Sequence, residues 1–211
     1  MTLKLNSAVS KNPVASLIYG LVLGAILVLG IRFATYAPEH IHYHANFAVY
    51  INGQQELFKE PRYYQEVAIC SKGRGITVPE ARVHLHDNDN SAIHVHDHAV
   101  TWGQFFNNLG WNIGSDFIQT ADSTMYRADG TNKLHIFINN QDYTDLTNLA
   151  NTVIKDKDRL LISYGNQDDA TLLKEAKAVS SSAAKYDVSK DPASCAGAET
   201  VTLHDRLKHL F

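Results

Sequence analysis

The segment "PVASLIYGLVLGAILVLGI", residues 13–31, restricts the fold most strongly, because it contains no charged side chain over 19 residues. This length matches the ~20 apolar residues that an α-helix needs to cross a bilayer, and it is long for the apolar part of a signal peptide. Lys4 and Lys11 precede the segment and favour a cytoplasmic N-terminus, whereas Arg32 follows it and weakens the charge asymmetry. The sequence therefore predicts an N-terminal transmembrane helix.

This helix assigns the parts of the chain to compartments. We expect residues 1–12 in the cytoplasm, a membrane-embedded signal anchor over residues 13–36, and the remainder outside the cytoplasmic membrane. The sequence before Pro38 offers only a poor cleavage site. An uncleaved single-pass anchor is therefore the main prediction, and cleavage is the alternative.

Two cysteines, Cys70 and Cys195, lie in the portion predicted to be outside the membrane, where disulfides can form. A bridge between them would close a long loop and would stabilise the fold by roughly 4–5 kcal/mol in the chain-entropy model. Two unpaired thiols are the alternative. The chain has no Cys-x-x-Cys motif, which argues against a thioredoxin-type redox site.

The composition is that of a folded protein. Apolar residues make up 45% of the chain and charged residues 19%, with a formal net charge of −3. These values argue against intrinsic disorder, and the absence of a basic stripe argues against a nucleic-acid partner. The portion after the anchor is long enough for one domain with a buried core, and the sequence identifies no protein partner.

Alternating patterns predict paired strands. In residues 40–58, apolar residues alternate with histidines, and Asn52-Gly53 is typical of a two-residue hairpin turn. Residues 81–100 predict a second hairpin, and residues 123–140 predict a third, with Asp129-Gly130 at its turn.

A short helix is predicted over residues 101–111, "TWGQFFNNLGW", and a final strand over residues 159–164. We therefore expect a strand-rich α+β domain over residues 40–165. Residues 166–211 are polar and rich in Ala, Ser and Lys, and predict a tail of short helices and linkers.

Eight of the eleven histidines lie in two tracts, "HIHYH" at 40–44 and "VHLHDNDNSAIHVHDH" at 83–98. Residues two apart on a strand share a face, so each tract directs its imidazoles to one side. A hairpin that pairs residue 86 with residue 94 would also place residue 84 opposite residue 96. Cross-strand β-carbons lie only ~4.5–5.5 Å apart, close enough for imidazoles to share a metal ion.

Metal ligation is the main explanation for this pattern, and a solvated or pH-sensing histidine face is the alternative. The predicted ligands are His84, His86, His94, His96 and His98, joined by His42 and His44 if their strand lies alongside. Imidazole ligands suit Zn²⁺ or Cu²⁺, and also Ni²⁺ or Fe²⁺. With only two Met and two Cys in the chain, a Cu⁺ carrier is disfavoured.

Asp97 and His135 are predicted to support the ligands from outside, as acceptors or orienting groups. A metal-dependent hydrolase or oxidase is an alternative function. It would need a general base, for which Glu56, Asp87 and Asp97 are candidates.

The segments "HYHANFAVYINGQ", "VHLHD…AIHVHDHAVTWGQFFNNLGW" and "KLHIFINN…IKDKDRLLISYG" together resemble an uncharacterised family of prokaryotic, membrane-anchored, exported His-rich domains. The resemblance covers about residues 40–165 and implies no established activity. Some members are labelled protein-disulfide isomerase, but the present chain lacks the Cys-x-x-Cys that this chemistry uses. The ending "KDKDRLLISYG" also resembles the close of a β-grasp fold.

Overall fold

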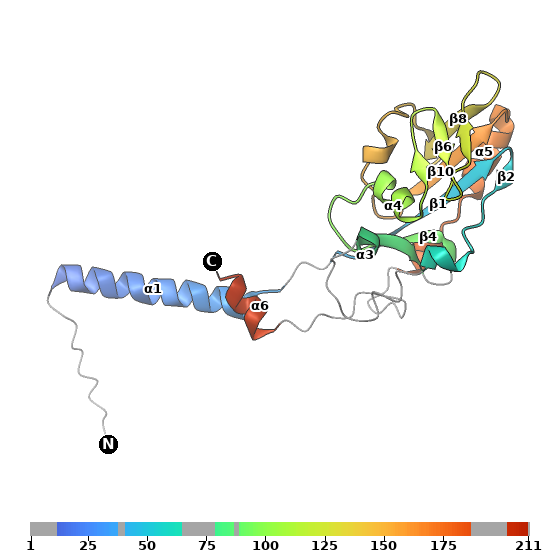
Figure 1. The fold of residues 1–211 in the computed structure, drawn as a ribbon. Helices are drawn as coiled ribbons and strands as arrows, with labels where there is room; N and C mark the ends of the chain where they lie inside the picture. The colour runs from blue at the N-terminus through green and yellow to red at the C-terminus, as the bar shows by residue number, and fades with distance from the viewer. Residues whose placement is uncertain (1–11, 38–40, 65–78, 87–88, 187–201, 211) are drawn as a thin grey trace. The chain divides into compact units, whose positions relative to one another are not determined.

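The computed structural model describes residues 12–37, 41–64, 79–86, 89–186 and 202–210 (Figure 1). The chain forms two compact units. One consists of the two chain ends, Met1–Glu39 and Ala198–Phe211, and the other extends from His40 to Gly197.

Helix α1 (Pro13–Thr35) forms most of the first unit together with helix α6 (Leu203–Lys208). Asn12 caps α1 by accepting a hydrogen bond from the Val14 amide at 3.0 Å, and Pro13 occupies the first helical position, where its missing N–H costs nothing. None of the α1 side chains is buried, and the helix is long and apolar enough to cross a membrane. A helix that could cross a membrane is thus present over nearly the residues predicted.

The second unit is built on a seven-stranded mixed sheet with the order β3-β4-β1-β10-β8-β9, in which β2 also pairs with β1. Its strands are β1 (Tyr43–Ile51), β2 (Gln54–Gln55), β3 (Val83–His86), β4 (Asp89–Val95), β8 (Lys133–Ile138), β9 (Gln141–Asp142) and β10 (Arg159–Gly165). β1 is parallel to β10, whereas β4 and β8 are antiparallel to their neighbours. This α+β arrangement confirms the predicted fold class, and the resemblance to a β-grasp fold stays a prediction.

The two faces of β1 follow the sequence alternation. Ala45, Phe47 and Val49 point into the main hydrophobic core, while His44 and Asn46 lie on the opposite face. At the end of β1 the predicted Asn52-Gly53 turn is present, and both residues have positive φ, 52° and 77°. The first predicted hairpin is confirmed, with β2 as a short second strand.

Helix α4 (Trp102–Asn108) covers the core face of the sheet. Thr101 and Gln104 form a reciprocal capping box at its start. Phe105 packs edge-on against Phe47 of β1, with ring centroids 4.9 Å apart, and Gly110 follows the helix with φ 75°. The helix predicted over residues 101–111 is confirmed.

The third predicted hairpin is wrong in its pairing. β7 (Met125–Arg127) pairs with β6 (Phe117–Gln119) in a separate three-stranded sheet with β5 (Asn112–Ile113), whereas β8 joins the large sheet. The Asp129-Gly130 turn is present, since Asp129 accepts hydrogen bonds from the two amides that follow Gly130. This turn connects two sheets, because the strand after it, β8, pairs with β10 over six residue pairs.

The remaining helical segments are short. They are η1 (Pro61–Tyr64), α3 (Pro79–Arg82), η2 (Leu149–Asn151), α5 (Asp169–Ala178) and η3 (Ser182–Lys185). α5 packs through Ala176 onto Ala48 and Leu161, on the sheet face opposite α4. This helix follows residue 165, yet it belongs to the same compact unit as the sheet.

Candidate metal centre

Histidines from three neighbouring strands meet on one face of the sheet. β4 lies between β3 and β1, and the register places His94 opposite His84 on one side and opposite His44 on the other. Because residues two apart share a face, His96 and His42 extend the same group along β4 and β1. The histidine cluster therefore comprises His42, His44, His84, His94 and His96.

His94 is the centre of the histidine cluster. Its ring centroid lies 4.5–5.4 Å from the centroids of the other four rings. The ligand nitrogens form two groups of three, His42/His44/His94 and His84/His94/His96, each with all nitrogens within 4.8 Å of one another. Two imidazole nitrogens on one tetrahedral Zn²⁺ lie about 3.3 Å apart, given bonds of about 2.0–2.1 Å. A bound metal ion would hold the nitrogens of a group at about this separation.

Two of the rings already direct nitrogen atoms at each other. His42 Nε2 and His94 Nε2 are 2.5 Å apart, the distance of a short hydrogen bond. A hydrogen bond between these two atoms requires a hydrogen on one nitrogen and a lone pair on the other. A metal ion can replace that proton, because both nitrogens can then direct lone pairs at the same cation.

His84 is oriented by the backbone. Its Nδ1 lies 2.9 Å from the Glu80 carbonyl oxygen, and since a carbonyl only accepts, Nδ1 carries the hydrogen. Nε2 then holds the lone pair that a metal ion would need. This tautomer is the one in which metal-binding histidines are commonly held.

The centre of the histidine cluster is shielded from bulk solvent. His44, His84 and His94 have exposed fractions of 0%, 1% and 0%. Burial, with a contribution from the neighbouring histidines, lowers the pKa of His94 well below its usual value. His94 is therefore neutral at physiological pH, which is the protonation state of a metal ligand.

Residues after α5 form one wall of the histidine cluster. Asn46 donates to the Ser91 carbonyl and to Ser182 Oγ, and accepts from the Ala183 amide, each at 2.9 Å, so it fastens η3 to β1 and β4. The next residue after η3, Tyr186, packs its ring 5.5 Å from that of His44. Its hydroxyl donates to Asp89 at 2.9 Å.

Asp89 supplies negative charge beside this wall. Burial would raise its pKa, but hydrogen bonds from Ser182, Ser91 and Tyr186 outweigh burial and lower the pKa below its usual value. Asp89 is thus ionised at neutral pH, linked to His44 through the Tyr186 side chain.

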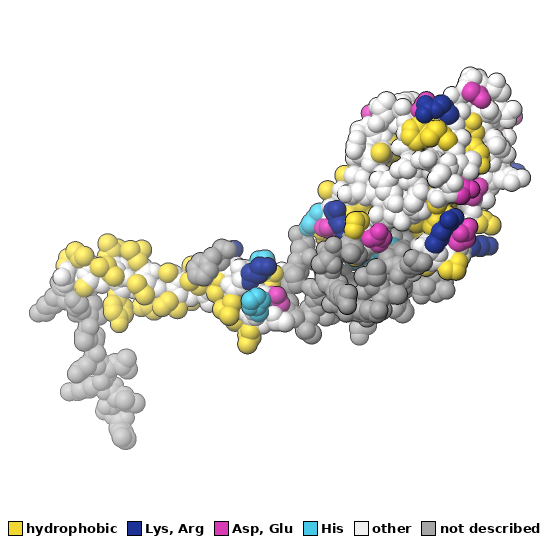
Figure 2. Space-filling model, in the orientation of Figure 1, with side chains coloured by type: hydrophobic (Ala, Val, Ile, Leu, Met, Phe, Trp, Pro, Cys, Tyr) yellow, Lys and Arg dark blue, Asp and Glu magenta, His cyan; other side chains and the backbone are white. Residues whose placement is uncertain are grey.

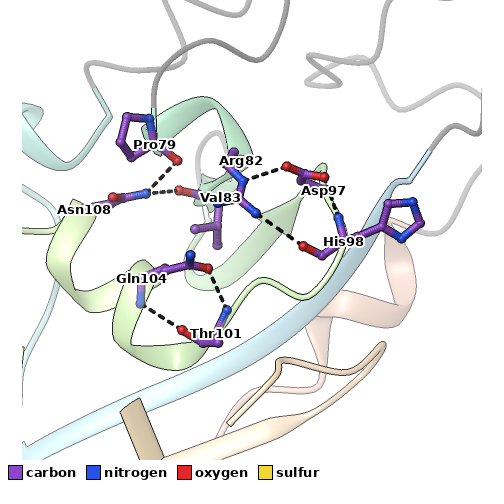
Figure 3. A network of polar contacts seen from close by, with 8 residues as sticks. All are labelled: Pro79, Arg82, Val83, Asp97, His98, Thr101, Gln104 and Asn108. Carbon is purple, nitrogen blue, oxygen red and sulfur yellow. Dashed lines mark hydrogen bonds and ion pairs between the residues drawn. The ribbon is translucent and has the colours of Figure 1, made fainter. Parts of the chain in front are cut away.

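A polar network fixes the segments that carry His84 and His96 (Figure 3). Asn108 of α4 donates to the carbonyl of Pro79, the first residue of α3, at 2.9 Å and to the carbonyl of Val83, which follows α3, at 3.0 Å. Arg82 pairs with Asp97 at 2.6 Å, and its carbonyl accepts from the His96 amide at 2.9 Å. The backbone next to both histidines is therefore held from outside the histidine cluster.

The β3–β4 register differs from the one predicted. His84, not His86, lies opposite His94, and the register is interrupted between Leu85 and His86. In this register Leu85 lies opposite Ile93, and the valines at 83 and 95 face each other in the core. The predicted register would have placed Val83 opposite the charged Asp97. The burial of apolar side chains in the core therefore sets the register of β3 and β4.

Three other predicted site residues lie elsewhere. β4 ends at Val95, and His98 is exposed in the turn that leads to α4, outside both three-histidine groups. Asp97 pairs with Arg82 and accepts a hydrogen bond from the His98 backbone amide. His135 lies on the same sheet face but pairs with Ser163 of β10, which in turn lies opposite Tyr50 of β1. Tyr50 is six residues along β1 from His44, a distance of about 20 Å.

The other candidates can be placed only in part. His86 is in β3, but its side chain lies outside the described residues, as do Cys70, Cys195 and Asp87. Their predicted roles therefore stay predictions. Glu56 follows β2 at the far end of β1 from His44, where its amide bonds to the Val49 carbonyl.

Two contributors to the site were not predicted. The Glu80 carbonyl has no sequence signature, because any residue offers the same acceptor. Tyr186 lies in a polar tail without periodicity, so nothing in the sequence connects it with residues 44 and 89.

Comparisons with known proteins return no match, whether against family models, curated proteins or solved structures. The case for a metal centre therefore rests on the geometry of the histidine cluster.

Proposed function

We propose that the chain is a membrane-anchored metal-binding protein that holds Zn²⁺ or Cu²⁺ through the histidine cluster. The observation that carries this proposal is the convergence of four imidazoles around that of the buried His94, at the point where three strands adjoin. A neutral imidazole offers one nitrogen lone pair, so a cation among these rings would be bound by several of them at once. A merely solvated face would not require three of these rings to be almost completely buried.

The donor set supports the proposed class of metal. The two three-histidine groups contain only imidazole nitrogens, which suit Zn²⁺ and Cu²⁺ better than Mg²⁺ or Ca²⁺. His94 is common to both groups and is the residue on which binding should depend most. Either group leaves at least one coordination position for a further histidine, a water molecule or a transferred ligand.

The location and relationship of the protein are also part of the proposal. α1 would cross the cytoplasmic membrane once as an uncleaved signal anchor, with the histidine cluster outside, supported by Lys4 and Lys11 ahead of the helix. The protein would belong to the family of exported His-rich domains that its motifs resemble. The isomerase label in that family is not extended to this chain, which has no Cys-x-x-Cys.

Elemental analysis tests the metal proposal. The full chain would be purified in detergent without a polyhistidine tag, beside His94→Ala and the matched control His135→Ala. We expect about one equivalent of Zn or Cu in the wild type and in the control, and a loss of most of it in His94→Ala. If no metal is retained after reconstitution and dialysis, the proposal is wrong and a pH-sensing face becomes the better account.

A further inference from the structure

The C-terminal helix α6 is specified by local signals in spite of its six residues. Thr202 and Asp205 form a reciprocal capping box, with the Asp205 amide 3.2 Å from Thr202 Oγ1 and the Thr202 amide 3.0 Å from the Asp205 carboxylate. Arg206 and Lys208 lie in its last turn, where positive charge complements the helix dipole. The helix is therefore a defined element at the end of the chain.

α6 is fastened to the C-terminal end of α1. Arg206 donates from Nη1 to the Phe33 carbonyl at 2.6 Å and to the Ala34 carbonyl at 3.1 Å. Carbonyls in the last turn of a helix have no partner within the helix, so this guanidinium caps α1. The His209 ring stacks on Tyr36, just beyond α1, with centroids 4.8 Å apart and planes within 13°.

One face of α6 is apolar and uncovered. Leu203 and Leu207 are four residues apart, on one side of the helix, and have exposed fractions of 71% and 56%. His204 and Lys208 project from other sides, and both are exposed. Figure 2 shows hydrophobic side chains over the visible face of α1.

We propose that α6 is an interfacial helix, with Leu203 and Leu207 in the outer part of a lipid bilayer at the point where α1 leaves it. A helix that caps the end of a membrane span is held at the boundary between acyl chains and headgroups, where an apolar face with basic flanks is stabilised. Lys208 then lies near lipid phosphates. The inference rests on the membrane-spanning role proposed for α1 and is independent of the histidine cluster.

The proposal has a consequence for the second unit, His40–Gly197, which carries the histidine cluster and is called the histidine-bearing unit below. α1 precedes this unit and α6 follows it, so the chain returns to the membrane after the unit. The cap that Arg206 forms on α1 also requires that α1 is retained, because cleavage after the helix would remove the carbonyls that Arg206 binds.

Depth-dependent fluorescence quenching tests this proposal on the full chain in phosphatidylcholine–phosphatidylglycerol vesicles. Leu207→Trp reports on α6, and the matched control Leu173→Trp reports on an exposed leucine of α5 (44%) in the other unit. The native Trp102 and Trp111 are buried, and their signal is subtracted using the parent protein. We expect lipid brominated near the top of its acyl chains to quench Leu207→Trp, and aqueous acrylamide to quench mainly Leu173→Trp. Adding Arg206→Gln to Leu207→Trp should lower the quenching by lipid.

Several results would overturn the proposal. If acrylamide quenches both introduced tryptophans equally, α6 lies in water. If neither quencher reaches Leu207→Trp, its leucine face is covered by protein, such as a second copy of the chain. If the chain does not float with the vesicles, α1 is not inserted and the premise itself fails. Flotation thus separates failure of the anchor from failure of α6.

Discussion

Metal-dependent thermal stabilisation should depend on His94 more than on any other residue of the histidine cluster. His94 belongs to both three-histidine groups, so His94→Ala leaves only two ligands in each group, whereas His84→Ala leaves His42, His44 and His94 intact. A ligand at 100 times its Kd stabilises the folded state by about 2.7 kcal/mol, which for a domain of this size raises Tm by about 5–11 °C. The loss of one direct ligand should cost more than the ~10–100-fold in affinity that outer partners contribute.

The assay is differential scanning calorimetry of the full chain in detergent, with excess Zn²⁺ and with a chelator, compared within each variant. We expect the full rise in Tm for the wild type and for His135→Ala, a smaller rise for His84→Ala, and almost none for His94→Ala. The comparison within a variant removes the effect of each substitution on the metal-free fold. An equal rise in wild type and His94→Ala would refute the assignment of His94 as the central ligand.

Three further predictions concern the fold and its response to pH. His94 is not protonated in the metal-free folded state but has its ordinary pKa of 6.5 when unfolded, so stability should fall as the pH drops below 6.5. Between about pH 7 and pH 5.5, this single residue should lower the free energy of unfolding by about 1 kcal/mol, measured by urea unfolding in the presence of a chelator. A free energy of unfolding that does not change over this range would contradict the burial of His94 as a neutral ring. Phe47→Ala should lower the free energy of unfolding by about 3–5 kcal/mol, because the ring is 1% exposed beneath α4, and urea unfolding would show a loss below 1 kcal/mol if that packing is absent. Asn46→Ala should lower the free energy of unfolding by about 1–3 kcal/mol and weaken metal binding, because η3 and the adjacent Tyr186 lose their hydrogen bonds to β1. An unchanged zinc affinity in a titration would show that these residues do not support the metal centre.

The strands of the histidine-bearing unit were predictable where one face is apolar. The alternation in residues 43–51 assigned Phe47 to the core and His44 to the other face, and both are found there. Side-chain alternation in a strand depends on backbone geometry alone, so local sequence is sufficient.

Pairing between distant strands was less predictable. The position of β1 beside β4, which brings His42 and His44 to His94, depends on contacts some fifty residues apart in the chain. Asp129-Gly130 identified a turn correctly but not the sheets that it joins, because turn chemistry specifies only the local backbone. The β3–β4 register likewise followed from apolar pairing across the core and not from the spacing of the histidines.

The sequence predicted the histidines of the site but not the groups that support them. His84, His94 and His96 come together as expected, and His42 and His44 join them. Tyr186 and the Glu80 carbonyl act through tertiary contacts that carry no sequence pattern. The exposed position of His98 follows from the turn at Ala99, whose φ of 53° redirects the chain toward α4.

The most direct test of the metal centre is X-ray absorption spectroscopy of the purified, metal-loaded full chain, with His94→Ala prepared in parallel. The account predicts a shell of nitrogen neighbours at about 2.0–2.1 Å with the multiple scattering of at least three imidazoles, and a failure of His94→Ala to retain the metal. A sulfur shell at about 2.3 Å, which would place the ion on cysteine, or a wild-type chain that retains no metal, would contradict it.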